Sequence, residues 1–133
     1  MAFDLRTKIY GLLRDDLQLQ EFVGKEIYQR SGLVQEVPPS ARPFIIYELG
    51  SENPVGPTVL RAKTAVVQTW VHDIMGDYAQ IDAILTRVKL VFEAAEVEDE
   101  FLELRYLSRS PDLEDLDLKT ICRYSRFSAT LTR

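Results

Sequence analysis

The chain has 133 residues, of which 46% are hydrophobic and 28% are charged, a balance that suits one folded domain over residues 1–133 and argues against disorder. The net charge of −5 leaves no electrostatic footprint for gripping nucleic acid. The single cysteine, Cys122, excludes an internal disulfide and a cysteine-based metal site, and it fits synthesis in a reducing compartment. No apolar run approaches about 18 residues and the N-terminus lacks an apolar core, so we expect neither a membrane span nor a signal peptide.

The first quarter of the chain has a helical pattern. Apolar residues at helical spacing predict a helix over about residues 4–16, with Asp4 positioned to cap its first turn. The segment "LQLQEFVG" adds a short helical turn that is expected to stop at Gly24. Residues 25–30, "KEIYQR", then favour a short strand.

The stretch 44–72 has the pattern of a long β-hairpin that follows a proline-containing loop over residues 31–42. Its first strand is "FIIYELG", residues 50–60 form the turn region with two prolines and two glycines, and its second strand runs from about Arg61 to His72. Both faces of the second strand carry apolar residues. This pattern indicates a central strand covered on both sides, in part by a partner.

The second half of the chain predicts a long helix and two strands. Asp77 and Gln80 have the spacing of a capping box. An apolar stripe with a period of about 3.6 residues follows, made of Tyr78, Ile81, Ile84, Leu85, Val88, Val91 and Phe92. A strand over "FLELRYLSR", a polar turn over "SPDLEDLD" and a closing strand over "TICRYSRFSATL" complete the chain.

The expected order is therefore α-β-β-β-α-β-β. Antiparallel hairpins dominate this order, which indicates an α+β fold with one mostly antiparallel sheet and helices packed on one face. The aromatic residues of the strands are expected to build the core, namely Tyr47, Trp70, Tyr106, Tyr124 and Phe127.

Charge is distributed unevenly near the C-terminus. Residues 96–117 hold nine acidic residues, whereas residues 118–133 hold four basic residues and no acidic one. Two interpretations stay open: a solvated acidic stretch beside a strand with long basic side chains, or charge matching between subunits.

The sequence offers no constellation of catalytic, metal-binding or cofactor-binding residues. His72 and Asp73 are neighbours on a strand and point to opposite faces, so they are not expected to act as base and orienter. Cys122 is expected to be a buried structural thiol. The acidic residues lack the spacing of a calcium-binding loop, and no phosphate-binding loop is present. We therefore expect no catalytic residue, no metal and no cofactor, and the chain is not predicted to be an enzyme.

The order of elements and several segments resemble the tail terminator, or tail completion, proteins of long-tailed bacteriophages and prophages. The segments that carry the resemblance are "KEIYQR", "RPFIIYELG", "TAVVQTWVHD" and "DYAQIDAILTRVKLVFEAA". The resemblance covers about Leu5 to Leu131, and its pieces are packing patterns rather than catalytic signatures.

The resemblance implies a structural role in the tail-neck region of a virion, after assembly in the host cytoplasm. Proteins of this family form a ring, typically of six subunits, which caps the head-proximal end of the tail tube and ends its polymerisation. The implied partners are further copies of the chain, the tail tube protein and a head completion or stopper protein. DNA passes through the lumen without specific binding, and neither a cofactor nor a membrane is involved.

Other readings remain open beside the tail terminator. Within the phage neck, the chain could be a head completion, stopper or minor tail assembly protein. Outside it, the chain could be a small enzyme or ligand-binding α+β domain, whereas the charge disfavours a nucleic-acid-binding module. Residues in the hairpin tip and in the acidic turn are the candidates for a subunit interface, with solvated loops as the other interpretation: Glu52, Asn53, Val55, Leu60, Arg61, Asp112, Glu114 and Asp115.

Overall fold

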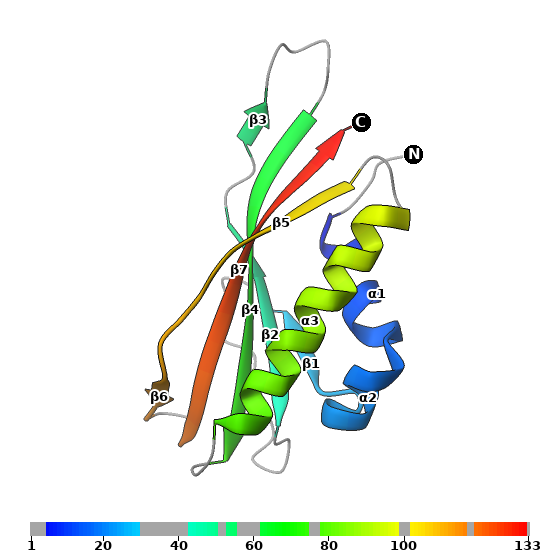
Figure 1. Ribbon diagram of the computed structural model, residues 1–133. Coiled ribbons are helices and arrows are strands. Elements are labelled where there is room, and N and C mark those ends of the chain that lie inside the picture. Colours follow the sequence, from blue (N-terminus) through cyan, green and yellow to red (C-terminus); the bar gives the residue numbers. More distant parts are fainter. Residues whose placement is uncertain are drawn as a thin grey trace.

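The described residues form two layers, with three helices packed on one face of a β-sheet (Figure 1). It comes from a computed structural model that describes residues 5–29, 43–50, 53–55, 62–74, 78–98, 102–116 and 119–132. Within these residues the fold is α+β, as the sequence predicted, and the sheet has seven strands.

The first two helices form where the sequence predicted helical segments. Helix α1 spans Leu5–Asp15 and α2 spans Leu17–Val23. Asp16 is the N-cap of α2, because its carboxylate accepts a hydrogen bond of 3.0 Å from the backbone N–H of Leu19. Gly24 ends α2 with a φ of 61°, a conformation that glycine adopts without strain, so the predicted stop is confirmed. The proposed cap at Asp4 lies outside the described residues.

The sheet is mixed, with the order β1-β2-β4-β7-β5. Strand β1 is parallel to β2, and the other pairings are antiparallel. Two short strands lie off this path, where β3 pairs with β4 and β6 pairs with β7. The strands are β1 (Ile27–Gln29), β2 (Phe44–Leu49), β3 (Asn53–Val55), β4 (Ala62–Ile74), β5 (Leu102–Arg109), β6 (Leu113–Asp115) and β7 (Thr120–Thr132).

The predicted hairpin is confirmed, but the two predicted turn regions are not simple turns. Strands β2 and β4 pair from Phe44 opposite His72 to Leu49 opposite Val67. The region 50–60 contains β3, and the region 110–117 contains β6. Strands β4 and β7 each have 13 residues, whereas β2 has 6 and β5 has 8. The long strands therefore extend past their neighbours, and the two short strands satisfy backbone groups at the extended ends.

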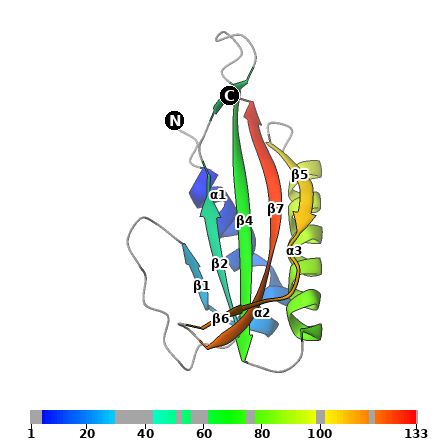
Figure 2. The same ribbon diagram turned by 90° about the vertical axis from the view of Figure 1, so that its left-hand side faces the viewer.

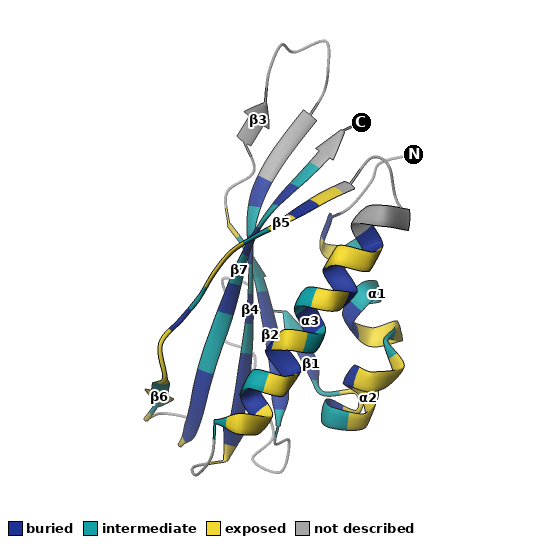
Figure 3. Ribbon diagram, in the orientation of Figure 1, coloured by how far each residue is buried: buried dark blue, intermediate teal, exposed yellow. Residues whose placement is uncertain are grey.

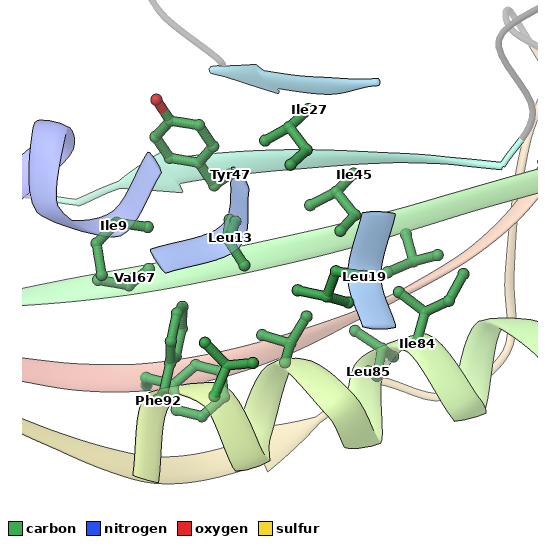
Figure 4. Close-up of a cluster of buried hydrophobic side chains, with 14 of the residues drawn as sticks. Ile9, Leu13, Leu19, Ile27, Ile45, Tyr47, Val67, Ile84, Leu85 and Phe92 are labelled. Carbon is green, nitrogen blue, oxygen red and sulfur yellow. The ribbon is translucent and has the colours of Figure 1, made fainter. Parts of the chain in front are cut away.

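The core lies between the sheet and helix α3, which spans Ala79–Glu98 (Figures 3 and 4). The predicted apolar stripe is confirmed, since all its members are buried except Tyr78, which packs against the core while partly exposed. Phe127 of β7 contacts Phe92 and Tyr106 edge-on, with ring centroids 4.8 Å and 5.7 Å away. The N-terminal part of the predicted capping box, Asp77, lies outside the described residues.

An ion pair joins the two helical segments across the layer. Two of the guanidinium nitrogens of Arg87 on α3, Nε and Nη2, donate to the carboxylate of Asp16, at 2.9 Å and 2.7 Å. The hydrogen bonds from Arg87 hold the pKa of Asp16 below its usual value despite the opposing effect of burial. Asp16 therefore caps α2 and anchors α3 with the same carboxylate.

Two buried hydroxyl groups on the inner face of the sheet lead to a first prediction. Thr69 and Ser125 lie opposite each other on β4 and β7, and both are fully buried. In the part of the chain that the structure describes, neither hydroxyl has a hydrogen-bond partner. Because a buried hydroxyl without a partner destabilises the fold by about 1–3 kcal/mol, we expect Thr69→Val and Ser125→Ala to raise the free energy of unfolding by about 1 kcal/mol.

The measurement is urea denaturation of each variant beside the wild type. Thr120→Val is the matched control, because the Thr120 hydroxyl is also buried but lies 2.8 Å from Nδ1 of His72. This control should destabilise the protein, since it breaks a hydrogen bond that the other two hydroxyls lack. A loss of stability in Thr69→Val as large as in Thr120→Val would contradict the prediction.

Candidate assembly surface

One face of the sheet carries no helix among the described residues, and we call it the helix-free face (Figure 2). Strand alternation and the pairing registers place every second residue of β2, β4 and β7 on it. Its central members are Phe44, Ile46 and Glu48 on β2, Val66, Gln68, Trp70 and His72 on β4, and Cys122, Tyr124 and Arg126 on β7.

A row of ring side chains crosses this face from β1 to β7. Tyr28 meets Phe44 edge-on at 6.1 Å, and Phe44 stacks on His72 at 4.8 Å. Trp70 lies 6.2 Å from His72 and 4.6 Å from Tyr124. Phe44 and His72 are buried, whereas Trp70 and Tyr124 are half-buried and present ring surface to solvent. The row therefore has a packed centre and an accessible side.

Polar side chains border the accessible rings. A carboxylate oxygen of Glu48 accepts a hydrogen bond of 3.2 Å from the indole N–H of Trp70. The guanidinium of Arg126 lies 5.5 Å from the ring centroid of Tyr124, and its Nη2 donates to the side-chain oxygen of Gln68 at 3.1 Å. Trp, Tyr and Arg are the residue types that contribute most to protein–protein binding energy. The composition of this patch is thus that of a protein-docking surface.

A shallow hollow of about 450 Å³ adjoins the patch. It is lined by Glu48, Leu49, Gly50, Val66, Gln68 and Arg126. Its walls combine apolar side chains with one cationic and one anionic group, so the hollow suits a side chain of a partner protein more than a free apolar ligand.

The structure separates the two sets of predicted interface residues. Strand β3, with Asn53 and Val55, pairs with β4 at residues 62–64. Strand β6, with Glu114 and Asp115, pairs with β7 at residues 120–122, which lie opposite residues 72–74 of β4. At about 3.3 Å per residue, these two ends of β4 are about 33 Å apart. Glu52, Leu60 and Arg61 lie outside the described residues.

The acidic strand β6 is held by side chains of its own chain. The hydroxyl of Tyr78 donates to the carbonyl oxygen of Leu113 at 2.8 Å. Partial burial and the nearby negative charges of Asp112 and Glu114 raise the pKa of Tyr78, which keeps the hydroxyl a donor. The position of β6 at this end of the sheet is therefore fixed from the helix layer.

Arg123 connects the basic strand to the acidic turn. It donates to the carbonyl oxygen of Ser110 at 2.9 Å and 2.7 Å, forms an ion pair with Asp82, and lies 3.6 Å from a carboxylate oxygen of Asp112. Arg123 of the basic strand is thus linked to Asp112 of the acidic turn within one chain.

Residues considered for chemistry occupy structural positions. His72 is buried on the helix-free face, and its neighbour Asp73 points to the other face and accepts a hydrogen bond of 2.8 Å from the backbone N–H of Ile74. Cys122 is a buried thiol, as predicted. Over the described ranges, no three His, Cys, Asp or Glu side chains group together as metal ligands would.

Sequence reasoning missed the accessible aromatic patch. It placed all strand aromatics in the core, which is correct for Tyr47 and Phe127 but wrong for Trp70 and Tyr124. The alternation along β4 had already placed Trp70 with Gln68 on the face opposite Val67 and Val71, and the apolar residues on both faces indicated cover on both sides, in part by a partner. Residue type alone does not tell which face of a sheet the helices cover.

Comparison with solved structures gives a match over nearly the whole chain. No protein-family model matches the chain, and no curated protein matches its sequence. Among solved structures, a chain from a structure described as "Virion of native gene transfer agent (GTA) particle" matches with a TM-score of 0.69 and 21% identity. The match covers 97% of this chain and 95% of that chain, so the two share a fold over nearly their whole lengths. In the described part of the chain, no helix is long and apolar enough to cross a bilayer.

Proposed function

We propose that this protein is a structural component of a phage-like virion, where it forms a ring that caps the head-proximal end of the tail tube. The observation that carries the proposal is the fold shared, over 97% of this chain, with a chain of a gene transfer agent virion. The resemblance in sequence to tail terminator proteins supports the same role. In this role the chain ends tube polymerisation and offers the surface to which the head completion or stopper protein binds.

The geometry of the chain suits such a ring. The sheet has candidate contact surfaces at two ends about 33 Å apart and a third on the helix-free face. A subunit that binds a neighbour through two different patches generates a closed ring when the rotation closes. The net charge of −5 fits a conduit through which DNA slides without adhering, since like charge repels the phosphates.

A second candidate is another neck protein, such as a head completion or stopper protein, which is also small and ring-forming. The sheet with a single long covering helix favours the terminator, because completion proteins tend to be more helical and stoppers tend to be small barrels.

Deletion of the gene in the parent phage-like element tests the proposal. We expect overlong tails and heads that stay unjoined, because tube growth then lacks its stop and heads lack their docking ring. Electron microscopy of the particles measures both, and a plasmid copy of the wild-type gene should restore normal tails. Tails of normal length with unjoined heads would instead favour the second candidate, and normal particles would refute both.

A further inference from the structure

Arg126 is a half-buried cation without a carboxylate partner among the described residues. Its Nη2 donates to Gln68, and its Nε is buried and has no acceptor within the described part of the chain. Arg87 and Arg123, by contrast, each pair with an aspartate. Burial of a guanidinium without an anion costs free energy, and a carboxylate is the group that it binds with the best geometry. The surroundings of Arg126 are therefore complementary to a carboxylate from outside this chain.

The hollow beside Arg126 is complementary to an apolar side chain. Leu49, Gly50 and Val66 contribute its apolar lining. Gly50 leaves the hollow open, and a Cβ added there would meet Val66 only at 3.5 Å, an ordinary contact. Glu48 also borders the hollow, but its carboxylate accepts a hydrogen bond from Trp70. The site is thus complementary to a short segment that carries both an apolar group and an anion.

The chain itself carries such a segment at the end of β6. Leu116 is 78% exposed, the highest value among the exposed large apolar residues of the described chain. Glu114 is exposed as well and forms no ion pair with another described residue. Leu116 lies in the turn that follows β6, two residues after Glu114 and directly after the last paired residue, Asp115. Glu114 and Leu116 therefore present an anion and an apolar group together.

Within one chain this segment and the hollow cannot meet. Asp115 of β6 pairs with Thr120 of β7, and Arg126 lies six residues further along β7, which is about 20 Å. We propose that Leu116 and Glu114 of one copy dock in the hollow and against Arg126 of the next copy. The proposal deepens the proposed function and rests on it, because two different patches in contact give the head-to-tail arrangement from which rings close.

Sedimentation of the purified full-length chain, up to about 1 mM, tests the contact. Arg126→Glu removes the cation, and Leu116→Ser removes the apolar group. Each variant alone should stay monomeric, with association weakened at least about thirtyfold, whereas the wild type should form species larger than a dimer. Gly50→Leu fills the hollow without touching the core and should act like Arg126→Glu.

A mixture of the two variants is the decisive sample. A head-to-tail contact uses the hollow of one copy and the segment of the other, so an equimolar mixture of Arg126→Glu and Leu116→Ser retains one intact contact per pair. We expect dimers and nothing larger. Arg105→Glu and Leu17→Ser are matched controls, since both residues are exposed and lie outside the proposed contact, and they should associate as the wild type does.

Variants that associate like the wild type would overturn the contact, as would a wild type that remains monomeric at about 1 mM. Loss of binding to a short DNA duplex in Arg126→Glu, with association unchanged, would also overturn it and identify a phosphate site instead. Failure of the contact is distinguishable from failure of the proposed function. A phage carrying Arg126→Glu with tails of normal length would refute the contact alone, whereas normal particles after gene deletion would refute the proposed function.

Discussion

Replacement of Phe127 by alanine is expected to lower the free energy of unfolding by about 3–5 kcal/mol, the largest effect that we predict for a single substitution. Phe127 is 1% exposed and lies on the inner face of β7, where its ring contacts Phe92 of α3 and Tyr106 of β5. Truncation removes the apolar surface of the ring and leaves a cavity where the helix meets the sheet. It also removes two edge-on aromatic contacts, each of which contributes about 0.5–1.5 kcal/mol beyond burial.

Urea denaturation of purified protein measures this effect. Phe127→Leu is a graded comparison, because it keeps most of the apolar volume and should cost clearly less than the alanine variant. Leu107→Ala on β5 is the matched control, since this side chain is 47% exposed and its truncation should change stability by less than about 0.5 kcal/mol. A loss below about 1 kcal/mol in Phe127→Ala would show that β7 and α3 do not form a common core.

Asp16→Ala is expected to lower the free energy of unfolding by about 1–3 kcal/mol, because one carboxylate serves two helices. Loss of the N-cap of α2 accounts for about 0.5–2 kcal/mol of this, and loss of the partly exposed pair with Arg87 for about 0.2–1 kcal/mol. Asp16→Asn keeps an oxygen for the cap and should cost less. A double-mutant cycle with Arg87→Met measures the coupling between the two side chains.

The same pair gives a dependence on pH with a defined sign. The pKa of Asp16 is lower in the folded protein than in the unfolded chain, so its charge stabilises the fold fully above the unfolded pKa of about 3.9. This contribution is lost as the pH falls through the folded pKa. The stability difference between wild type and Asp16→Asn should therefore be constant near pH 7 and shrink in acid below about pH 4. A difference that grows in acid would contradict the assignment.

The elements that local pattern determines were predictable. The apolar stripe of α3 keeps a helical period from Ile81 to Phe92, and both faces of β4 carry apolar residues. The helix and the central place of β4 in the sheet therefore followed from the sequence. Gly24 supplied the stop of α2 through its conformational freedom.

The elements that depend on distant neighbours were not predictable. Strand β3 contains Pro54 and has three residues, and it forms because β4 extends beyond β2 and offers backbone partners. Strand β6 forms beside the overhang of β7 in the same way. For the candidate surface, the sequence pointed to the acidic segment 112–115 but not to the surface around Arg126. Arg126, Trp70 and Tyr124 come together only through the register of β2, β4 and β7.

The long β4–β7 ladder has a mechanical consequence. It pairs 13 residues of each strand, from Ala62 opposite Thr132 to Ile74 opposite Thr120. At the end of the ladder beside β3 the chain enters β4, whereas at the end beside β6 it enters β7. A force applied to β4 at the end beside β3 and to β7 at the end beside β6 would pull the two strands in opposite directions along their length, across hydrogen bonds that run perpendicular to it. Such a pull shears all the bonds together instead of opening them one by one, so this subunit should resist stretching most strongly along the axis that joins its two ends.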